Sequence, residues 1–145
     1  MQVSHVEAVN PEEYVQRRVL IVDDNPELRG LLADCLETAG YLPIQAQDGL
    51  AGWLAFREQS PHLAVVDLSM PVMSGFRLLW LLRAAKPAQA PHIPVVVISG
   101  HDPQEASEVI AAARPEAYLL KPFGPERFLS TVRALLGSGP DGLTG

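Results

Sequence analysis

The chain has 145 residues, a length suited to one domain of ordinary size, and 48% of its residues are hydrophobic against 19% charged. This balance allows a packed core and excludes a disordered chain. Eleven Lys and Arg against seventeen Asp and Glu leave a net charge of −6, which disfavours binding to nucleic acid, itself a polyanion. One cysteine excludes an internal disulfide and fits a reducing compartment. Because no apolar run reaches the roughly 18 residues of a membrane span, we expect a cytoplasmic domain that enters no membrane.

Short apolar segments without polar alternation predict β-strands that are covered on both faces. Pro43 lies within the second segment and predicts that this strand is at an edge of the sheet, because proline cannot donate to a central ladder. Each of the other four segments is directly followed by a polar residue. In chain order, the expected strands are Val19–Val22, Tyr41–Gln45, Leu63–Val66, Val95–Ile98 and Tyr118–Leu120.

Segments with helical spacing separate these strands, and each begins at a recognisable start signal. Asn25 offers an N-cap before Pro26 at the first helical position, and Gly40 stands where that helix needs a left-handed C-cap. Alternation of strands and helices predicts a doubly wound α/β domain, a parallel sheet with helices on both faces. The later helices are expected to start at Asp48–Gly49, Ser74–Gly75, Asp102 and Pro125–Glu126. Asp102 and Glu105 have the spacing of a capping box.

The predicted domain occupies residues 17–137. Residues 1–16 form a polar N-terminal extension, and residues 138–145 are rich in glycine. Such a composition predicts a flexible C-terminal tail or the start of a linker.

Polar side chains at the carboxyl ends of the strands mark the expected functional site. In an open parallel sheet this edge holds the binding crevice. If the first and third strands are neighbours, Asp23, Asp24 and Asp67 converge, and three close carboxylates disfavour one another's ionised form. A hard divalent cation with oxygen ligands relieves that repulsion, and magnesium suits such a site. With Ser99 and Lys121 on the same edge, the pattern predicts phosphoryl transfer to an aspartyl nucleophile.

These residues resemble the receiver domains of two-component response regulators. The resemblance covers about residues 17–137 and rests on the motifs VLIVDDNPELRGLL, LAVVDLSMPVMSGFRLL, VVVISG and AYLLKPF. It implies a flavodoxin-like fold, with five parallel strands in the order 2-1-3-4-5. It also implies a module that phosphorylates and dephosphorylates itself with magnesium but has no other enzymatic activity.

The resemblance assigns a role to each candidate residue. Asp67 would be the phospho-acceptor, Asp23 and Asp24 the acidic pair for Mg²⁺ (with Mn²⁺ as a substitute), and the backbone carbonyl of Ser69 the third protein ligand. Ser99 corresponds to the hydroxyl that holds the phosphoryl group. Lys121, before a cis Pro122, would neutralise the charge of the phosphoryl group, and Tyr118 would be the aromatic switch residue. Ser69 and His101 would flank the approach of the water that hydrolyses the phosphorylated state.

The implied partners are a sensor histidine kinase or a histidine phosphotransfer protein, which would donate the phosphoryl group. A downstream protein or output domain would read the face formed by the helix after Asp102, the strand Tyr118–Leu120 and the helix from Pro125. A homodimer linked to phosphorylation is also compatible with the family. We expect no direct contact of this chain with nucleic acid or membrane.

Two departures from the family and three alternative functions remain open. Arg114 and Pro115 stand where the family usually has Gly-Ala, and Arg114 enters a left-handed turn less readily than glycine, so the end of the preceding helix is expected to be reshaped. Gly100 follows Ser99 where alanine is commoner.

A flavodoxin-like redox protein shares the fold, but the Asp-Asp-Asn of this chain in the first loop would repel the phosphate of a bound flavin. A haloacid-dehalogenase-type phosphatase needs Asp-x-Asp after the first strand, whereas the two acids of this chain are adjacent. A docking module independent of phosphorylation would not need the acidic residues and the lysine that this chain carries.

Overall fold

Five parallel strands form a single sheet in the order β2-β1-β3-β4-β5, which confirms the predicted architecture. The computed structural model describes residues 16–68, 70, 74–84, 92–102, 104, 107, 111 and 114–137. The strands are β1 (Arg18–Val22), β2 (Leu42–Ala46), β3 (Leu63–Asp67), β4 (Val95–Ser99) and β5 (Ala117–Leu120). As Pro43 predicted, β2 lies at an edge, and it alternates between exposed and buried positions, whereas β3 and β4 are buried throughout.

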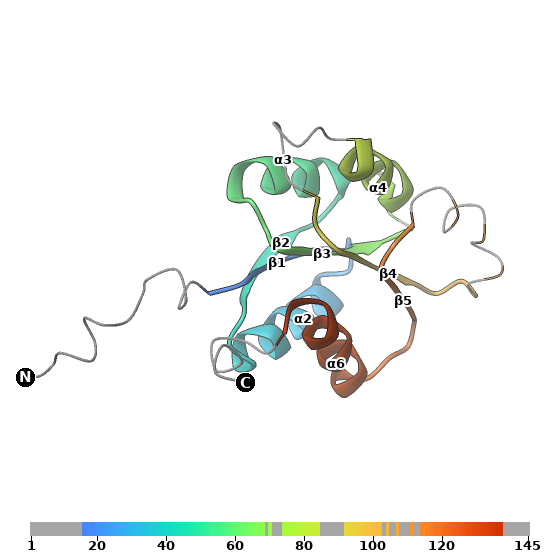
Figure 1. Cartoon of the computed structure of the whole chain (residues 1–145). Helices are drawn as coiled ribbons and strands as arrows, with labels where there is room; N and C mark the ends of the chain where they lie inside the picture. Colours follow the sequence, from blue (N-terminus) through green and yellow to red (C-terminus); the bar gives the residue numbers. More distant parts are fainter. Residues whose placement is uncertain are drawn as a thin grey trace, which may run out of the picture.

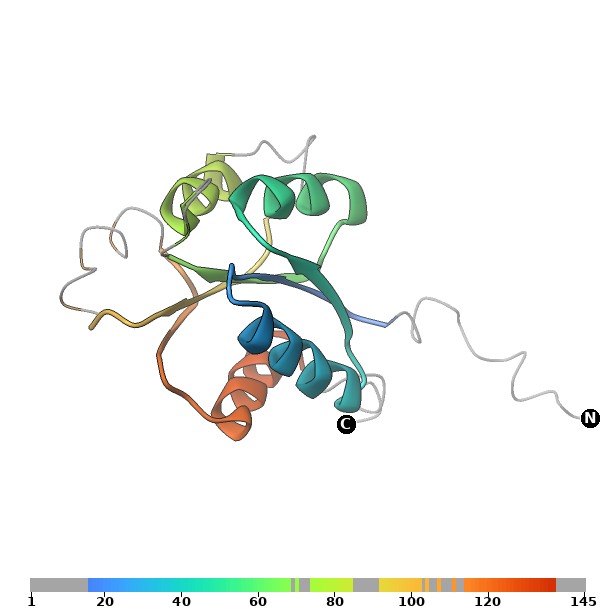
Figure 2. The same cartoon turned by 180° about the vertical axis from the view of Figure 1, so that it is seen from behind.

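Helices cover both faces of the sheet. The helices α3 (Gly49–Gln59) and α4 (Gly75–Ala84) lie on one face, and α2 (Pro26–Thr38) and α6 (Pro125–Leu136) lie on the other (Figures 1 and 2). Each pair seals its own apolar core against the sheet, one around Leu20, Phe56 and Leu78 and the other around Leu36 and Phe128. None of the helices in the described ranges is long and apolar enough to cross a bilayer.

The helix start signals act as the sequence predicted. The Asn25 side chain accepts the N–H groups of Glu27 and Leu28, and Asp48 accepts the N–H of Ala51 at 2.8 Å. Each bond satisfies an N–H that has no partner within its helix. Ser74 Oγ accepts the N–H of Arg77 at 3.1 Å, Pro125 begins α6, and Gly40 is left-handed with φ 94°. The helix expected after Asp102 lies largely outside the described residues, although Asp102 Oδ1 does accept the Gln104 N–H at 2.8 Å.

Arg83 of α4 joins the amino-terminal ends of β4 and β5. Its guanidinium donates to the carbonyls of Ile93 and Arg114 at 3.1 and 3.0 Å and to Glu116 Oε1 at 2.7 Å. Glu116 Oε1 also accepts the N–H of Val95 at 2.7 Å. Partial burial opposes ionisation of Glu116, but these donors outweigh it and lower the pKa of Glu116. Arg114 does take the left-handed conformation, with φ 48°, and its carbonyl bond to Arg83 helps to hold it there.

His62 fixes the start of β1, and this contact makes stability depend on pH. The Arg18 N–H donates to His62 Nδ1 at 2.9 Å, which requires a neutral ring. Burial and the nearby Arg18 and Arg17 lower the pKa of His62. The unfolded chain therefore binds more protons than the folded one below about pH 6.5, the ordinary imidazole value.

We expect stability to fall as pH drops from 7 through that range, and to fall less in His62→Asn, whose amide oxygen accepts the same N–H without titrating. Urea unfolding midpoints measured between pH 7 and 5 give the comparison. His92→Asn is the control, because the His92 side chain is 70% exposed. Equal pH dependence in the parent chain and His62→Asn would remove His62 as the cause.

Candidate functional site

Three carboxylates converge at the carboxyl-terminal edge of the sheet, as the sequence predicted. One oxygen from each of Asp23, Asp24 and Asp67 lies within 4.8 Å of the others. Strands β1 and β3 bring them together, because they are direct neighbours and pair Val22 with Val66. Asp67 is the last residue of β3 and is 4% exposed, Asp23 is completely buried, and Asp24 is exposed.

Lys121 joins the two buried carboxylates. Its Nζ lies 3.3 Å from Asp23 Oδ2 and 3.4 Å from Asp67 Oδ2. Burial of like charges is unfavourable unless an opposite charge is close, and this ammonium provides one. Three carboxylates and one ammonium leave a formal charge of −2 on the four side chains. Their oxygen donors and residual charge suit a hard divalent cation such as magnesium.

Asp23 is held by bonds on several sides. Its Oδ1 accepts the N–H of Asn25 at 2.9 Å, and its backbone carbonyl accepts Arg29 Nη1 at 2.7 Å. Arg29 in turn donates through Nε to Gln45 Oε1 at 3.2 Å, which links α2 to β2. The Asp23 side chain is therefore oriented before any ligand arrives, because its rotamer and its backbone are both fixed.

Ser99 and Lys121 occupy adjacent positions at the ends of β4 and β5. Ser99 is fully buried, and its carbonyl accepts the Lys121 N–H at 2.7 Å. The peptide bond between Lys121 and Pro122 is cis, as the resemblance implied. Ser99 Oγ accepts the N–H of His101 at 3.0 Å, so the hydroxyl is engaged by its own loop.

Tyr118 and His101 are joined through the backbone. The Tyr118 hydroxyl donates to the His101 carbonyl at 2.6 Å, and the half-buried Tyr118 ring packs against the core beneath α3 and α4. The imidazole of His101 is exposed. Ser69, the remaining candidate, lies outside the described residues.

Gly75, for which the sequence predicted only a helix start, belongs to the site. A Cβ built on Gly75 would lie 1.7 Å from the Asp67 carbonyl oxygen and 2.7 Å from Leu68 Cα. The Gly75 N–H also donates to the Leu68 carbonyl at 3.2 Å. The first turn of α4 thus packs directly on the backbone of the aspartate, and only glycine fits between them.

Comparison with known proteins identifies the family. The family model described as "Response regulator receiver domain" matches residues 19–133, and the chain belongs to this family. It is 31% identical to the polar-differentiation response regulator DivK of Brucella ovis over 121 residues, which is 83% of this chain and 97% of that protein. It is also 32% identical to the sensor histidine kinase TmoS of Ectopseudomonas mendocina over 90% of this chain, which is 15% of the kinase.

Solved structures agree with the observed fold. Chemotaxis protein CheY4 of Vibrio cholerae superposes with a TM-score of 0.76 at 27% identity, covering 83% of this chain and 99% of that one. The receiver domain of sensor histidine kinase PA1611 from Pseudomonas aeruginosa, solved with a magnesium ion in its active-site cleft, has a TM-score of 0.75 at 22% identity. That likeness covers 86% of this chain and all of the domain. Receiver domains are signalling modules, and this chain shares their acidic pocket.

Gly75→Ala should disrupt the acidic site and destabilise the fold. The added methyl group meets the backbone of Asp67 rather than a movable side chain, so we expect a loss well above the about 1 kcal/mol of a typical substitution. Gly30→Ala in α2 is the matched control, because its Cβ meets nothing within 4 Å and alanine favours a helix by about 0.5–1 kcal/mol. Chemical unfolding curves of the two variants should move in opposite directions. A Gly75→Ala protein as stable as the parent would contradict the close packing.

Proposed function

We propose that the chain is a phosphorelay receiver that accepts a phosphoryl group on Asp67 and changes the surface it presents to a partner. The observation that carries this proposal is the grouping of Asp23, Asp24 and Asp67 around the Lys121 ammonium. Asp67 is the residue suited to attack, because it ends the central strand β3 and faces the same edge as the other two. The membership of the chain in the receiver family supports this assignment.

The proposed donor is a phosphohistidine of a sensor histidine kinase or of a histidine phosphotransfer protein. A carboxylate oxygen of Asp67 attacks the phosphorus, a P–O bond forms, and the P–N bond to the histidine breaks. The electron pair of that bond stays on the imidazole nitrogen, which takes up a proton. Catalysis of such a transfer depends mainly on positioning and charge stabilisation. Lys121 contributes here, because its Nζ already lies 3.4 Å from the acceptor side chain.

The proposed ligands of Mg²⁺, or of Mn²⁺ in its place, are the side chains of Asp23, Asp24 and Asp67 and the backbone carbonyl of Ser69. The oxygen donors and their uncompensated charge fit such an ion, and the magnesium in the cleft of the PA1611 receiver domain supports the choice. When bound, the ion supplies positive charge that offsets the negative charge of the phosphoryl oxygens. The bonds of Asp23 to Asn25 and Arg29 hold this one ligand in place even without the ion.

Ser99, His101 and Tyr118 form the proposed switch. If the Ser99 hydroxyl turns to donate to the phosphoryl group, it changes its contact with the His101 N–H. The His101 carbonyl is the acceptor for Tyr118, so the loop and the ring respond to the same event. The switch is an equilibrium between two states, one with the Ser99 hydroxyl bound within its own loop and one with the hydroxyl turned inward to the phosphoryl group. The phosphoryl group can shift this equilibrium only by the interaction energy that it gains in the inward state.

The face proposed to carry the signal comprises the segment after Ser99, β5 and α6. Leu120 on β5 is 43% exposed there, and β5 is an edge strand. A downstream protein, an output domain or a second phosphorylated copy would bind this face. We place the chain in the cytoplasm, with no direct nucleic-acid or membrane contact, and as a signalling module rather than an enzyme that turns over a substrate.

Incubation with acetyl phosphate and Mg²⁺ should add one phosphoryl group, detected as a mass increase of the intact protein. Asp67→Asn should abolish the increase, because the amide is not a nucleophile for phosphorus, and chelation of the metal should suppress it. Asp34→Asn is the matched control, since Asp34 lies exposed on α2 outside the acidic group. Labelling of Asp67→Asn at the rate of the parent chain would refute Asp67 as the acceptor.

His101 is proposed to speed the loss of the phosphoryl group by orienting the attacking water. Its exposed imidazole stands on a backbone held at both ends by Ser99 and Tyr118, which restricts where the ring can lie. His101→Ala should therefore slow phosphate release severalfold and leave the rate of phosphorylation unchanged. The decay of isolated phosphoprotein provides the measurement, and Gln104→Ala, an exposed neighbour in the same loop, provides the control. Equal decay rates for all three proteins would show that His101 has no part in hydrolysis.

A further inference from the structure

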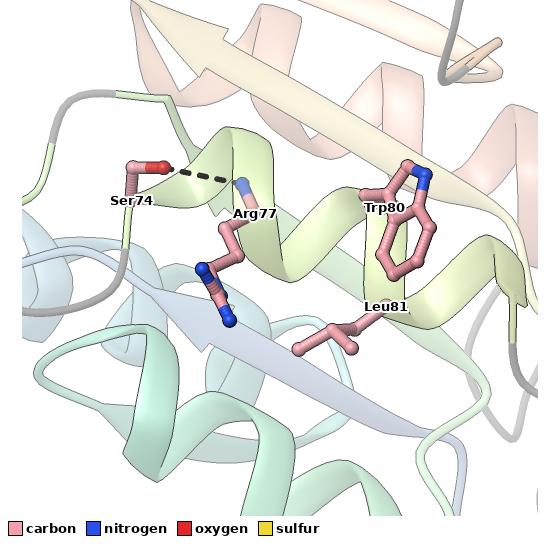
Figure 3. A pocket seen from close by; sticks show the side chains of 4 residues that line it. All are labelled: Ser74, Arg77, Trp80 and Leu81. Carbon is pink, nitrogen blue, oxygen red and sulfur yellow. Dashed lines mark hydrogen bonds between the residues drawn. The ribbon is translucent and has the colours of Figure 1, made fainter.

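The outer face of α4 has the composition of a covered surface. Ser74, Arg77, Trp80 and Leu81 line a groove of about 520 Å³ on this face (Figure 3). Trp80 is 60% exposed, and the only polar side chains of α4 are two arginines. A helix that is apolar almost all round is ordinarily buried on all sides, and exposed tryptophan beside arginine is typical of contact surfaces.

The neighbouring helix α3 extends this surface. Leu50 and Leu54, one turn apart, are 48% and 44% exposed, and α3 and α4 lie side by side over the same face of the sheet (Figures 1 and 2). A Cβ on Gly52 of α3 would lie 3.0 Å from Leu78 of α4, so the two helices are in close contact. We call the outward side of these two helices the α3/α4 face.

The α3/α4 face is basic, although the chain is acidic as a whole. The exposed charged residues of the two helices are Arg57, Arg77 and Glu58, a net charge of +1. Arg83 is not counted, because its guanidinium is paired with Glu116 at the end of β5. The helix α2 on the opposite side carries three acids and one arginine, a net charge of −2. An acidic and apolar segment is therefore attracted to the α3/α4 face and repelled by α2. A second copy would meet this face with its own arginines, which disfavours a symmetric dimer through it.

We propose that residues 1–15 of the same chain pack on the α3/α4 face. This segment contains three glutamates and no lysine or arginine, which complements the arginines, and its apolar residues suit Trp80 and the exposed leucines. Fifteen residues reach at most about 50 Å, whereas a domain of this size has a radius of gyration of about 14 Å. Tethering also gives the segment a millimolar effective concentration, so that weak contacts suffice. The relevant side chains are Val3, Val6, Glu7, Val9, Glu12, Glu13 and Tyr14.

The groove between α2 and α6 is a weaker site for this segment. It is lined in part by Leu31, Cys35 and Leu129, but Asp34 lines it as well as Arg133. The acid cancels the attraction of the arginine, and the other acids of α2 are close along the helix. The two grooves therefore differ in charge more than in apolar character, and an experiment can separate them.

A nitroxide label near the N-terminus tests the proposal in the full chain. The label is attached to Ser4→Cys in a Cys35→Ala background, which removes the one native thiol, and amide spectra check that the fold is kept. We expect the amide signals of Arg77, Trp80 and Leu81 to lose most of their intensity and to regain it when ascorbate reduces the label. Signals of Leu31 and Leu129 in the α2–α6 groove, away from the turn where residue 16 enters the domain, should lose little.

Replacement of Glu7, Glu12 and Glu13 by glutamine in the same labelled chain should restore the α4 signals at least in part. Glu27→Gln and Glu37→Gln on α2 are the matched controls, because they remove exposed acids outside the segment and should change nothing at α4.

Three results would overturn the proposal. The first is equal intensity at α4 with oxidised and reduced label, and the second is a stronger loss in the α2–α6 groove than at α4. The third comes from a mixture of labelled chain with unlabelled isotope-enriched chain, where broadening at α4 would mean that the segment binds a second copy instead. None of these readouts depends on phosphorylation of Asp67, so the proposal stands or falls apart from the proposed function.

Discussion

Burial of like charges at the carboxyl-terminal edge of the sheet is the constraint on which the rest of the structure depends. Asp23 and Asp67 are both removed from water, and Lys121 reaches them from the end of β5, across β4 and β3. The strand order allows this contact, because only β4 lies between β5 and β3. Two continuous apolar cores hold the backbone on either side, so that the repulsion between the carboxylates does not open the edge.

The elements that the sequence predicted best are those with a local cause. Asn25 and Asp48 cap helices because their side chains reach N–H groups two or three residues away, and such contacts depend on neighbouring residues alone. Pro43 marked the edge strand for an equally local reason, the absence of a backbone donor. The prediction that the three aspartates converge needed one assumption about distant segments, namely that β1 and β3 are neighbours. The family resemblance supplied the strand order, and the structure bears it out.

The features that sequence reasoning did not find arise between segments far apart in the chain. Gly75 owes its role to the Asp67 carbonyl oxygen at its Cα, a steric relation that no spacing rule expresses. Arg83 donates to carbonyls that follow it by 10 and 31 residues. Its bond to the Arg114 carbonyl helps to hold an arginine in the left-handed conformation at a place where the family usually has glycine. A signal for Gly75 did exist, since a glycine directly after a helix N-cap has no local advantage over other residues.

The two ends of the described domain are tied to a single turn. Gln16 Nε2 donates to the Gly40 carbonyl, and the Tyr41 hydroxyl donates to the Gly137 carbonyl at 2.6 Å. Entry and exit of the chain are therefore anchored beside each other, at the turn between α2 and β2. A domain with this property can be spliced between other domains, or repeated in tandem, without stretching its own framework. Because both ends are bonded to the turn at Gly40, a pulling force on either flanking polypeptide would be transmitted through this turn to the other end.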